Sequence, residues 1–218
     1  MSGSGLGKFR PPPAGCRKCP RLVDLRRECK RSFPDWHNAP VDAFGDLSAR
    51  YLIVGLAPGL RGANRTGRPF TGDAAGGYLF LMLRQFNLAS GSYSDDANDD
   101  LRLQDTRITN AVRCLPPENK PTSGEVNNCR DFLRREINAM PNLQTILALG
   151  KLAHDAVLRC FELPLKPYPF AHASLYDIAA RDRNLTLLSS YHCSRYNTQT
   201  GRLTEPMFAE IFEKLQKL

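Results

Sequence analysis

Four short apolar segments alternate with helical patterns along this chain, and they constrain its fold more than any other feature. They lie at 51–55, 107–112, 145–149 and 186–190. Short, mostly apolar runs of this kind are typical of parallel strands that are buried on both faces. In the stretches between and after them, apolar residues recur every three or four positions, which predicts helices at 74–87, 123–139, 151–162 and 204–217. This alternation predicts a three-layer α/β/α sandwich with a central four-stranded parallel sheet.

The length and charge of the chain limit its class. Its 218 residues, 42% of them hydrophobic, suit one domain over 1–218. Lys and Arg outnumber Asp and Glu by 30 to 22, and the net charge of +8 favours a polyanionic partner such as nucleic acid, although solubility explains it equally well. No apolar run approaches the roughly 20 residues that cross a bilayer, and residues 1–15 hold no apolar signal core. We therefore expect a cytoplasmic, nucleoid-associated protein without membrane contact.

The loops after the predicted strands indicate where a ligand would bind. Ligands of such sheets lie outside the carboxyl ends of the strands. The loops at 55–73, 110–121 and 191–202 are rich in Gly, Pro, Asn, His or Arg. The first of them, GLAPGLRGANRTGRPFTGD, lacks both the GK[ST] ending of a P-loop and the GxGxxG of a dinucleotide site. The acidic stretch at 92–100 is predicted to be a solvated loop rather than a metal site.

The cysteines have the spacing of a metal site. Cys16 and Cys19 form a C-x-x-C pair, and Cys114 and Cys129 flank a distant Pro-rich loop. An odd total of seven argues against a disulfide framework. Four thiolates brought together by folding can hold zinc or an iron–sulfur cluster, and the count does not separate the two. Ordinary buried cysteines are the alternative, and Cys29 could replace one member of the set.

Five motifs, in one order from Cys16 to Leu203, resemble the iron–sulfur uracil-DNA glycosylases, family 5 branch. They are VGLAPGLRGANRTGRPFTGDAAG, ITNAVRCLPPENKPTSGE, CRDFL, ILALG and SYHCSRYNTQTGRLT. The resemblance implies a monofunctional enzyme that flips uracil, and other deaminated bases such as hypoxanthine, out of DNA. It would hydrolyse the N-glycosidic bond and leave an abasic site.

The same resemblance implies a cofactor. It assigns a 4Fe-4S cluster to Cys16, Cys19, Cys114 and Cys129, and so favours iron over zinc. The N-terminal cluster-binding segment would lie at about 14–32.

Three residues match the base pocket of the family. Phe70 matches the ring that stacks on the flipped base, and Asn110 matches the asparagine that reads it. A carboxamide can donate to O4 of uracil and accept from N3–H, whereas cytosine reverses both groups. His192 matches the histidine whose neutral imidazole stabilises the negative charge of the departing base.

The first loop supplies the remaining pocket residues. Small residues there would bring backbone amides close to the base: Gly55, Ala57 and Pro58. Other glycosylase branches place an acid or amide side chain in this motif to orient the attacking water, which Leu56 and Ala57 cannot do. Asn64 and Asp73 are the candidates left for that task.

Arginines near the predicted pocket would bind phosphates, with affinity but no sequence preference. They are Arg65, Arg68, Arg195 and Arg202. Residues 194–203 would form the wedge that enters the duplex. Cys193 stands where the family has proline, so we expect a less rigid loop around His192. A monomer is expected, and a non-catalytic protein that binds damaged or abasic DNA, with a structural cluster, is the alternative function.

Overall fold

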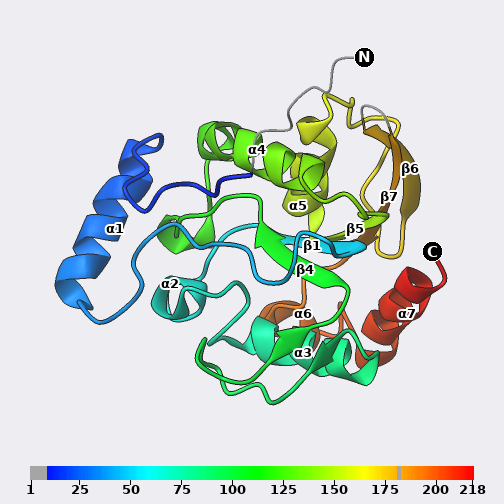
Figure 1. Cartoon of the computed structure of the whole chain (residues 1–218), viewed down its shortest axis with the longest axis horizontal. Helices are drawn as coiled ribbons and strands as arrows, with labels where there is room; N and C mark the ends of the chain where they lie inside the picture. Colours follow the sequence, from blue (N-terminus) through cyan, green and yellow to red (C-terminus); the bar gives the residue numbers. More distant parts are fainter. Residues whose placement is uncertain (1–8, 181–182) are drawn as a thin grey trace.

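The computed structural model describes residues 9–180 and 183–218, in which a five-stranded sheet lies between two layers of helices (Figure 1). The strand order is β4-β1-β5-β7-β6. The strands are β1 (Tyr51–Gly55), β4 (Thr106–Asn110), β5 (Thr145–Leu149), β6 (Leu175–Ala180) and β7 (Arg183–Ser190). A separate antiparallel pair consists of β2 (Ala89–Ser90) and β3 (Arg102–Leu103).

The four predicted strands are confirmed as the parallel part of the sheet. Every residue of β1, β4 and β5 is buried, because helices cover both faces of these strands. The expected total of four strands is wrong, since β6 pairs antiparallel with β7 at the sheet edge. Buried and more accessible positions alternate along most of β6. It therefore lacks the continuous apolar run by which a fully buried strand is recognised.

The four predicted helices are confirmed within two residues at each end. On one face of the sheet lie α4 (Ser123–Asn138) and α5 (Lys151–Cys160), and on the other lie α3 (Ala74–Gln85) and α7 (Glu205–Gln216) (Figure 1). Each pair buries its own cluster of apolar side chains against the sheet. The three-layer sandwich is thus confirmed. Shorter elements are α2 (Ala63–Thr66), η1 (Pro117–Asn119) and α6 (Arg195–Gln199), while α1 (Pro20–Ser32) lies to one side of the sheet.

A buried ionic group joins β4 to α4. Glu136 of α4 accepts hydrogen bonds from Arg107 at 2.7 Å and Thr109 at 2.9 Å, and it also pairs with Arg113. Burial favours the neutral acid, but Arg113 and Arg107 outweigh it and hold the pKa of Glu136 below its usual value. The group therefore fixes the strand that ends at Asn110 against the helix that carries Cys129.

None of the helices in residues 9–180 and 183–218 has the length and apolar character needed to cross a membrane. The lack of an apolar signal core was argued from residues 1–15. Residues 1–8 of this segment lie outside the described part of the chain.

Candidate active site

A cavity of about 600 Å³ opens where β1, β4 and β7 end. Its volume is typical of a small-molecule site. The residues that line it come mainly from the loops after these strands and the start of α3: Leu56, Ala57, Pro58, Gly59, Arg61, Ala63, Phe70, Gly72, Asp73, Ala74, Ala75, Asn110, Asn119, His192, Ser194 and Arg195. Phe70, Asn110 and His192, which are far apart in the sequence, therefore face one cavity.

Gly55 makes room for two of these side chains. It is the register partner of Asn110 on the neighbouring parallel strand. A Cβ atom built on Gly55 would lie 2.5 Å from Oδ1 of Asn110 and 2.6 Å from Cζ of Phe70. Phe70 has a φ of +54°, an unusual backbone conformation for a bulky residue, and is buried. Strain of this kind is common at functional sites, where the surrounding structure compensates for it.

His192 follows β7, and its ring lies against that of Phe70. The two ring centroids lie 5.9 Å apart, with an interplanar angle of 25°. Burial lowers the pKa of His192, and the opposing effect of the Asp73 carboxylate does not offset it. The imidazole is therefore neutral at pH 7. The side chain of Asn197 on α6 fixes the backbone here by donating to the carbonyl oxygen of His192 at 2.8 Å.

Cys193 anchors the histidine loop. Its side chain is buried in the apolar cluster shared with α3 and α7. Its thiol donates to the carbonyl oxygen of Ala75 at 3.5 Å, and burial raises the pKa of this thiol to about 12. Core packing of Cys193 thus holds the loop at the position where the family has proline, and the expectation of a less rigid loop stays a prediction.

The structure separates the two candidates for orienting water. Asp73 lines the cavity and caps α3, where its Oδ1 accepts from the amide of Gly76 at 3.0 Å. Asn64 is buried behind the loop, and its amide donates to Oδ1 of Asn38 at 2.9 Å. Asp73 can therefore reach a bound water, whereas Asn64 does not line the cavity.

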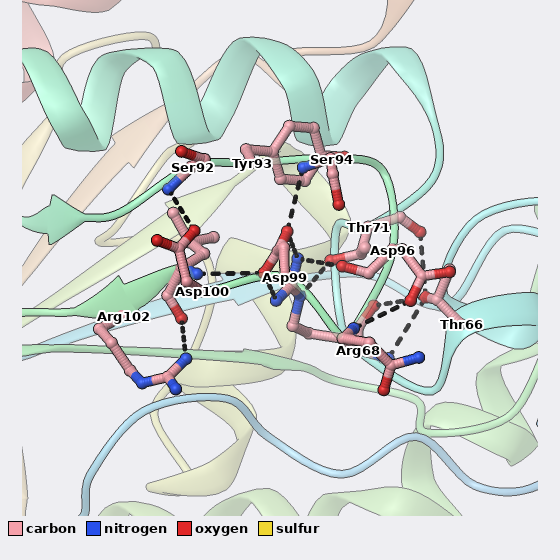
Figure 2. A network of polar contacts seen from close by, with 12 residues as sticks. Thr66, Arg68, Thr71, Ser92, Tyr93, Ser94, Asp96, Asp99, Asp100 and Arg102 are labelled. Atoms are coloured by element: carbon pink, nitrogen blue, oxygen red, sulfur yellow. Dashed lines mark hydrogen bonds and ion pairs between the residues drawn. The ribbon is translucent and has the colours of Figure 1, made fainter.

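Arg68 is buried, contrary to the expectation that it grips phosphate. Its guanidinium donates to both carboxylate oxygens of Asp99, at 2.6 and 2.7 Å, and to Oγ1 of Thr71 at 2.8 Å (Figure 2). The side chains of Arg68 and Asp99 are only 7% and 3% exposed. The hydrogen bonds from Arg68 lower the pKa of Asp99. The acidic loop is thus only partly solvated, because Asp99 turns inward to neutralise Arg68.

The other three arginines keep more solvent contact. Arg195 is exposed at the start of α6 and lines the cavity. Arg202 is exposed too, with its guanidinium 4.8 Å from the ring centroid of Tyr191. Arg65 is partly exposed, and it donates to the carbonyl oxygens of Arg61 and Asp95 at 2.9 and 3.0 Å.

Three lining residues with polar side chains were given no individual role from the sequence. They are Arg61, Asn119 and Ser194. Arg61 and Ser194 lie within the first and last matched motifs, so membership of a motif was the available signal. Asn119 reaches the cavity through η1 in the Pro-rich loop, where it adopts a φ of +57°.

The four cysteines of the predicted metal site line one small cavity. This cavity, of about 20 Å³, lies between α1, α4 and the loop after β4, and its lining includes Cys16, Cys19, Cys114 and Cys129. Burial raises the pKa of Cys114 to about 12, so four thiolates here require a positive partner. In the described residues no three His, Cys, Asp or Glu side chains are close enough to share one metal ion. Cys29 does not line the cavity.

Nitrogen donors surround three of these sulfurs. Arg26 donates to Cys114 at 3.8 Å, and Asn128 donates to Cys19 at 3.6 Å. The amide of Arg113 donates to Cys129 at 3.4 Å. Arg113 also lines this cavity, and within the described residues its Nε and Nη1 are buried without a hydrogen-bond partner. Such donors suit a group rich in negative sulfur, as an iron–sulfur cluster is.

Comparison with known families decides the relationship of this chain. Residues 43–216 match the model of the uracil DNA glycosylase superfamily. The chain belongs to this superfamily. The match includes every residue that lines the larger cavity, whereas Cys16 and Cys19 lie before its first residue.

Individual members of the superfamily resemble nearly the whole chain. The type-5 uracil-DNA glycosylase of Thermus thermophilus is 46% identical over 209 residues, which cover 93% of each chain. The type-5 enzyme of Pyrobaculum aerophilum is 40% identical over 203 residues, covering 91% of this chain and 87% of its own. The type-4 enzyme of Archaeoglobus fulgidus is 31% identical over 202 residues, with the same coverage. The likeness to these members therefore extends over more of the chain than the superfamily model matches.

Proposed function

We propose that this chain is a DNA repair glycosylase that excises uracil from DNA and leaves an abasic site. The type-5 uracil-DNA glycosylases that it resembles over most of its length support this activity. The observation that carries the proposal is the single cavity that Phe70, Asn110 and His192 line together. A target base must leave the duplex stack before it can enter such a cavity.

Recognition of the base is assigned to Phe70 and Asn110. Phe70 supplies an aromatic face for stacking, and Asn110 donates to O4 and accepts from N3–H of uracil. Cytosine presents the reverse pair and would leave the buried carboxamide unsatisfied. Hypoxanthine presents an acceptor next to an N–H donor, as uracil does, so we include it among the substrates. Gly55, Ala57 and Pro58 bring the backbone close to the base.

Cleavage is assigned to His192 and Asp73. As the glycosidic bond breaks, negative charge develops on O2 of the base, and a neutral His192 stabilises it by donating a hydrogen bond. Asp73 is the only carboxylate among the described residues that line the cavity. We assign to it the orientation of the attacking water and the stabilisation of positive charge on the sugar. None of the described lining residues is a lysine, which supports direct hydrolysis without a Schiff-base step.

We propose that Cys16, Cys19, Cys114 and Cys129 hold a 4Fe-4S cluster. The hydrogen-bond donors around three of the sulfurs support this fit. The cluster would tie the segment at about 14–32 to α4 and the loop after β4. Its contribution is to the fold of the N-terminal segment, and the residues of the larger cavity carry the chemistry.

Contacts with DNA beyond the flipped base are assigned to exposed residues around the cavity. Arg65, Arg195 and Arg202 contact phosphates, and residues 194–203 enter the duplex. Because one chain supplies every assigned group, we propose that it acts as a monomer and as one domain, on nucleoid DNA in the cytoplasm.

One experiment separates this function from that of a silent binder of abasic DNA. The purified protein is incubated with oligonucleotides that each carry one lesion, uracil or hypoxanthine among them, and the liberated bases are identified. Free uracil, with strand cleavage only after alkali, is the expected result, whereas tight binding of abasic DNA without base release would support the binder. A brown protein with stoichiometric iron and sulfide is expected, and a colourless protein that contains zinc would contradict the cluster.

A further inference from the structure

Two aromatic rings stack beside the proposed active site. Phe33 caps the C-terminus of α1, and Trp36 lies three residues further on. Their rings are nearly parallel, with centroids 3.9 Å apart and an interplanar angle of 7°. Phe33 is 38% exposed although it is a large apolar side chain. One face of each ring packs against the other ring, so the outer face of the pair remains available for stacking. We call this feature the aromatic pair.

Buried asparagines hold the aromatic pair in place. The amide of Asn38 donates to the carbonyl oxygens of Phe33 at 2.7 Å and Trp36 at 3.2 Å. Asn64, behind the first loop, donates in turn to Asn38. The turn is also joined to α2 by a backbone hydrogen bond from His37 to Arg65 at 3.0 Å. The loop after α1 is therefore anchored beside α2 and presents preorganised rings (Figure 1).

The aromatic pair lines a hollow that adjoins the active-site cavity. This hollow, of about 480 Å³, is lined by Phe33, Trp36, Arg61, Arg65 and Gly72. Arg61 and Gly72 also line the larger cavity, so the two spaces share a wall. Arg61 is exposed, and the last turn of α1 adds Lys30 and Arg31. Aromatic faces next to exposed positive charge are the features with which proteins bind single-stranded nucleic acid.

We propose that this hollow is a subsite for an unpaired base next to the flipped uracil. The base stacks on the aromatic pair, and Arg61 and Arg65 hold the adjoining phosphates. A neighbouring base in an intact duplex stays paired and stacked, so the subsite favours uracil in single-stranded DNA. The proposal rests on the proposed function, since it places the subsite beside the flipped base.

Trp36 gives a direct test, because it is the only tryptophan of the chain. The probe is a single-stranded oligothymidylate with one tetrahydrofuran abasic site, compared with the same strand in a duplex. Stacking on the aromatic pair should quench Trp36 fluorescence with the single strand and much less with the duplex. Phe33→Leu should weaken binding of the single strand by about tenfold, within the range for loss of one base–aromatic stack. Phe33→Tyr keeps an aromatic face and should bind as the wild type does.

Charge variants complete the test. Arg61→Gln should reduce the salt dependence of single-strand binding by about 0.7 in slope, as expected for one lost phosphate contact. Arg159→Gln, on the exposed side of α5 away from both cavities, is the matched control and should change nothing. Thermal unfolding of each variant checks that its fold is intact.

Uracil release from a duplex is measured in parallel, so that the two proposals can fail separately. The subsite is refuted and the function stands if the wild type releases uracil, but the single strand does not quench Trp36 fluorescence and binds Phe33→Leu and Phe33→Tyr with equal affinity. Equal quenching by the duplex would also refute the preference for an unpaired base. Quenching without any uracil release would refute the function and leave a single-strand site.

Discussion

Replacing Gly55 with alanine tests the geometry of the base pocket with one methyl group. The added carbon would lie 2.5 Å from Oδ1 of Asn110 and 2.6 Å from Cζ of Phe70. Non-bonded heavy atoms prefer separations of about 3.5 Å or more, so both side chains must retreat by about 1 Å. A misplacement of that size in a preorganised site can cost about 100-fold in rate. We therefore expect kcat/KM for uracil release to fall by about 100-fold, equivalent to about 2.7 kcal/mol.

The assay is single-turnover release of uracil, combined with thermal unfolding. Overpacking should also lower the stability of Gly55→Ala by about 1–3 kcal/mol, so the rate is measured well below the melting temperature. Gly124→Ala is the matched control, because its methyl group would meet nothing closer than Oγ1 of Thr122 at 3.8 Å. If Gly55→Ala released uracil within about threefold of the wild-type rate, the assignment of the base site to Asn110 and Phe70 would be refuted. Both side chains would have been displaced with almost no effect on catalysis.

Four other changes probe the site and its supports. His192→Ala should reduce base release by about 100-fold with little loss of DNA binding. Because burial lowers the pKa of His192, the wild-type rate should fall only below about pH 6.5, where the imidazole gains its proton. A rate that already falls at higher pH would contradict a neutral donor. Asn110→Asp should release cytosine as well as uracil in the same assay, and unchanged selectivity would remove Asn110 from base reading. Asp99→Asn leaves the buried Arg68 without its anion and should lower the free energy of unfolding, measured in urea, by about 3 kcal/mol. DNA binding should not become tighter. Tighter binding would indicate that Arg68 is a phosphate ligand after all. Arg26→Gln removes the guanidinium that donates to Sγ of Cys114 and should speed the loss of visible absorbance in a chelator. An unchanged rate would show that this donor does not stabilise the cluster.

The parallel strands and the position of the cavity could be read from the sequence. β1 is apolar along its whole length because helices cover both of its faces, and that pattern needs no knowledge of its neighbours. Once the strands are known, the general rule for parallel sheets places Asn110 and His192 at one edge. The edge strand β6 escaped detection because it is buried on one side only, so its pattern resembles that of a polar loop.

The sequence by itself determined the layers of the fold, the end of the sheet that binds the ligand and the residue types available there, because these follow from local apolar patterns and chain order. Only the tertiary structure decided what individual side chains of one motif do. Arg68 and Asn64 belong to the same loop as Arg65 and Asp73, yet Arg68 turns inward to Asp99 and Asn64 to Asn38. Their partners lie 31 and 26 residues away in the chain. A buried charge or amide must find such a partner, and which one it meets depends on packing between distant segments.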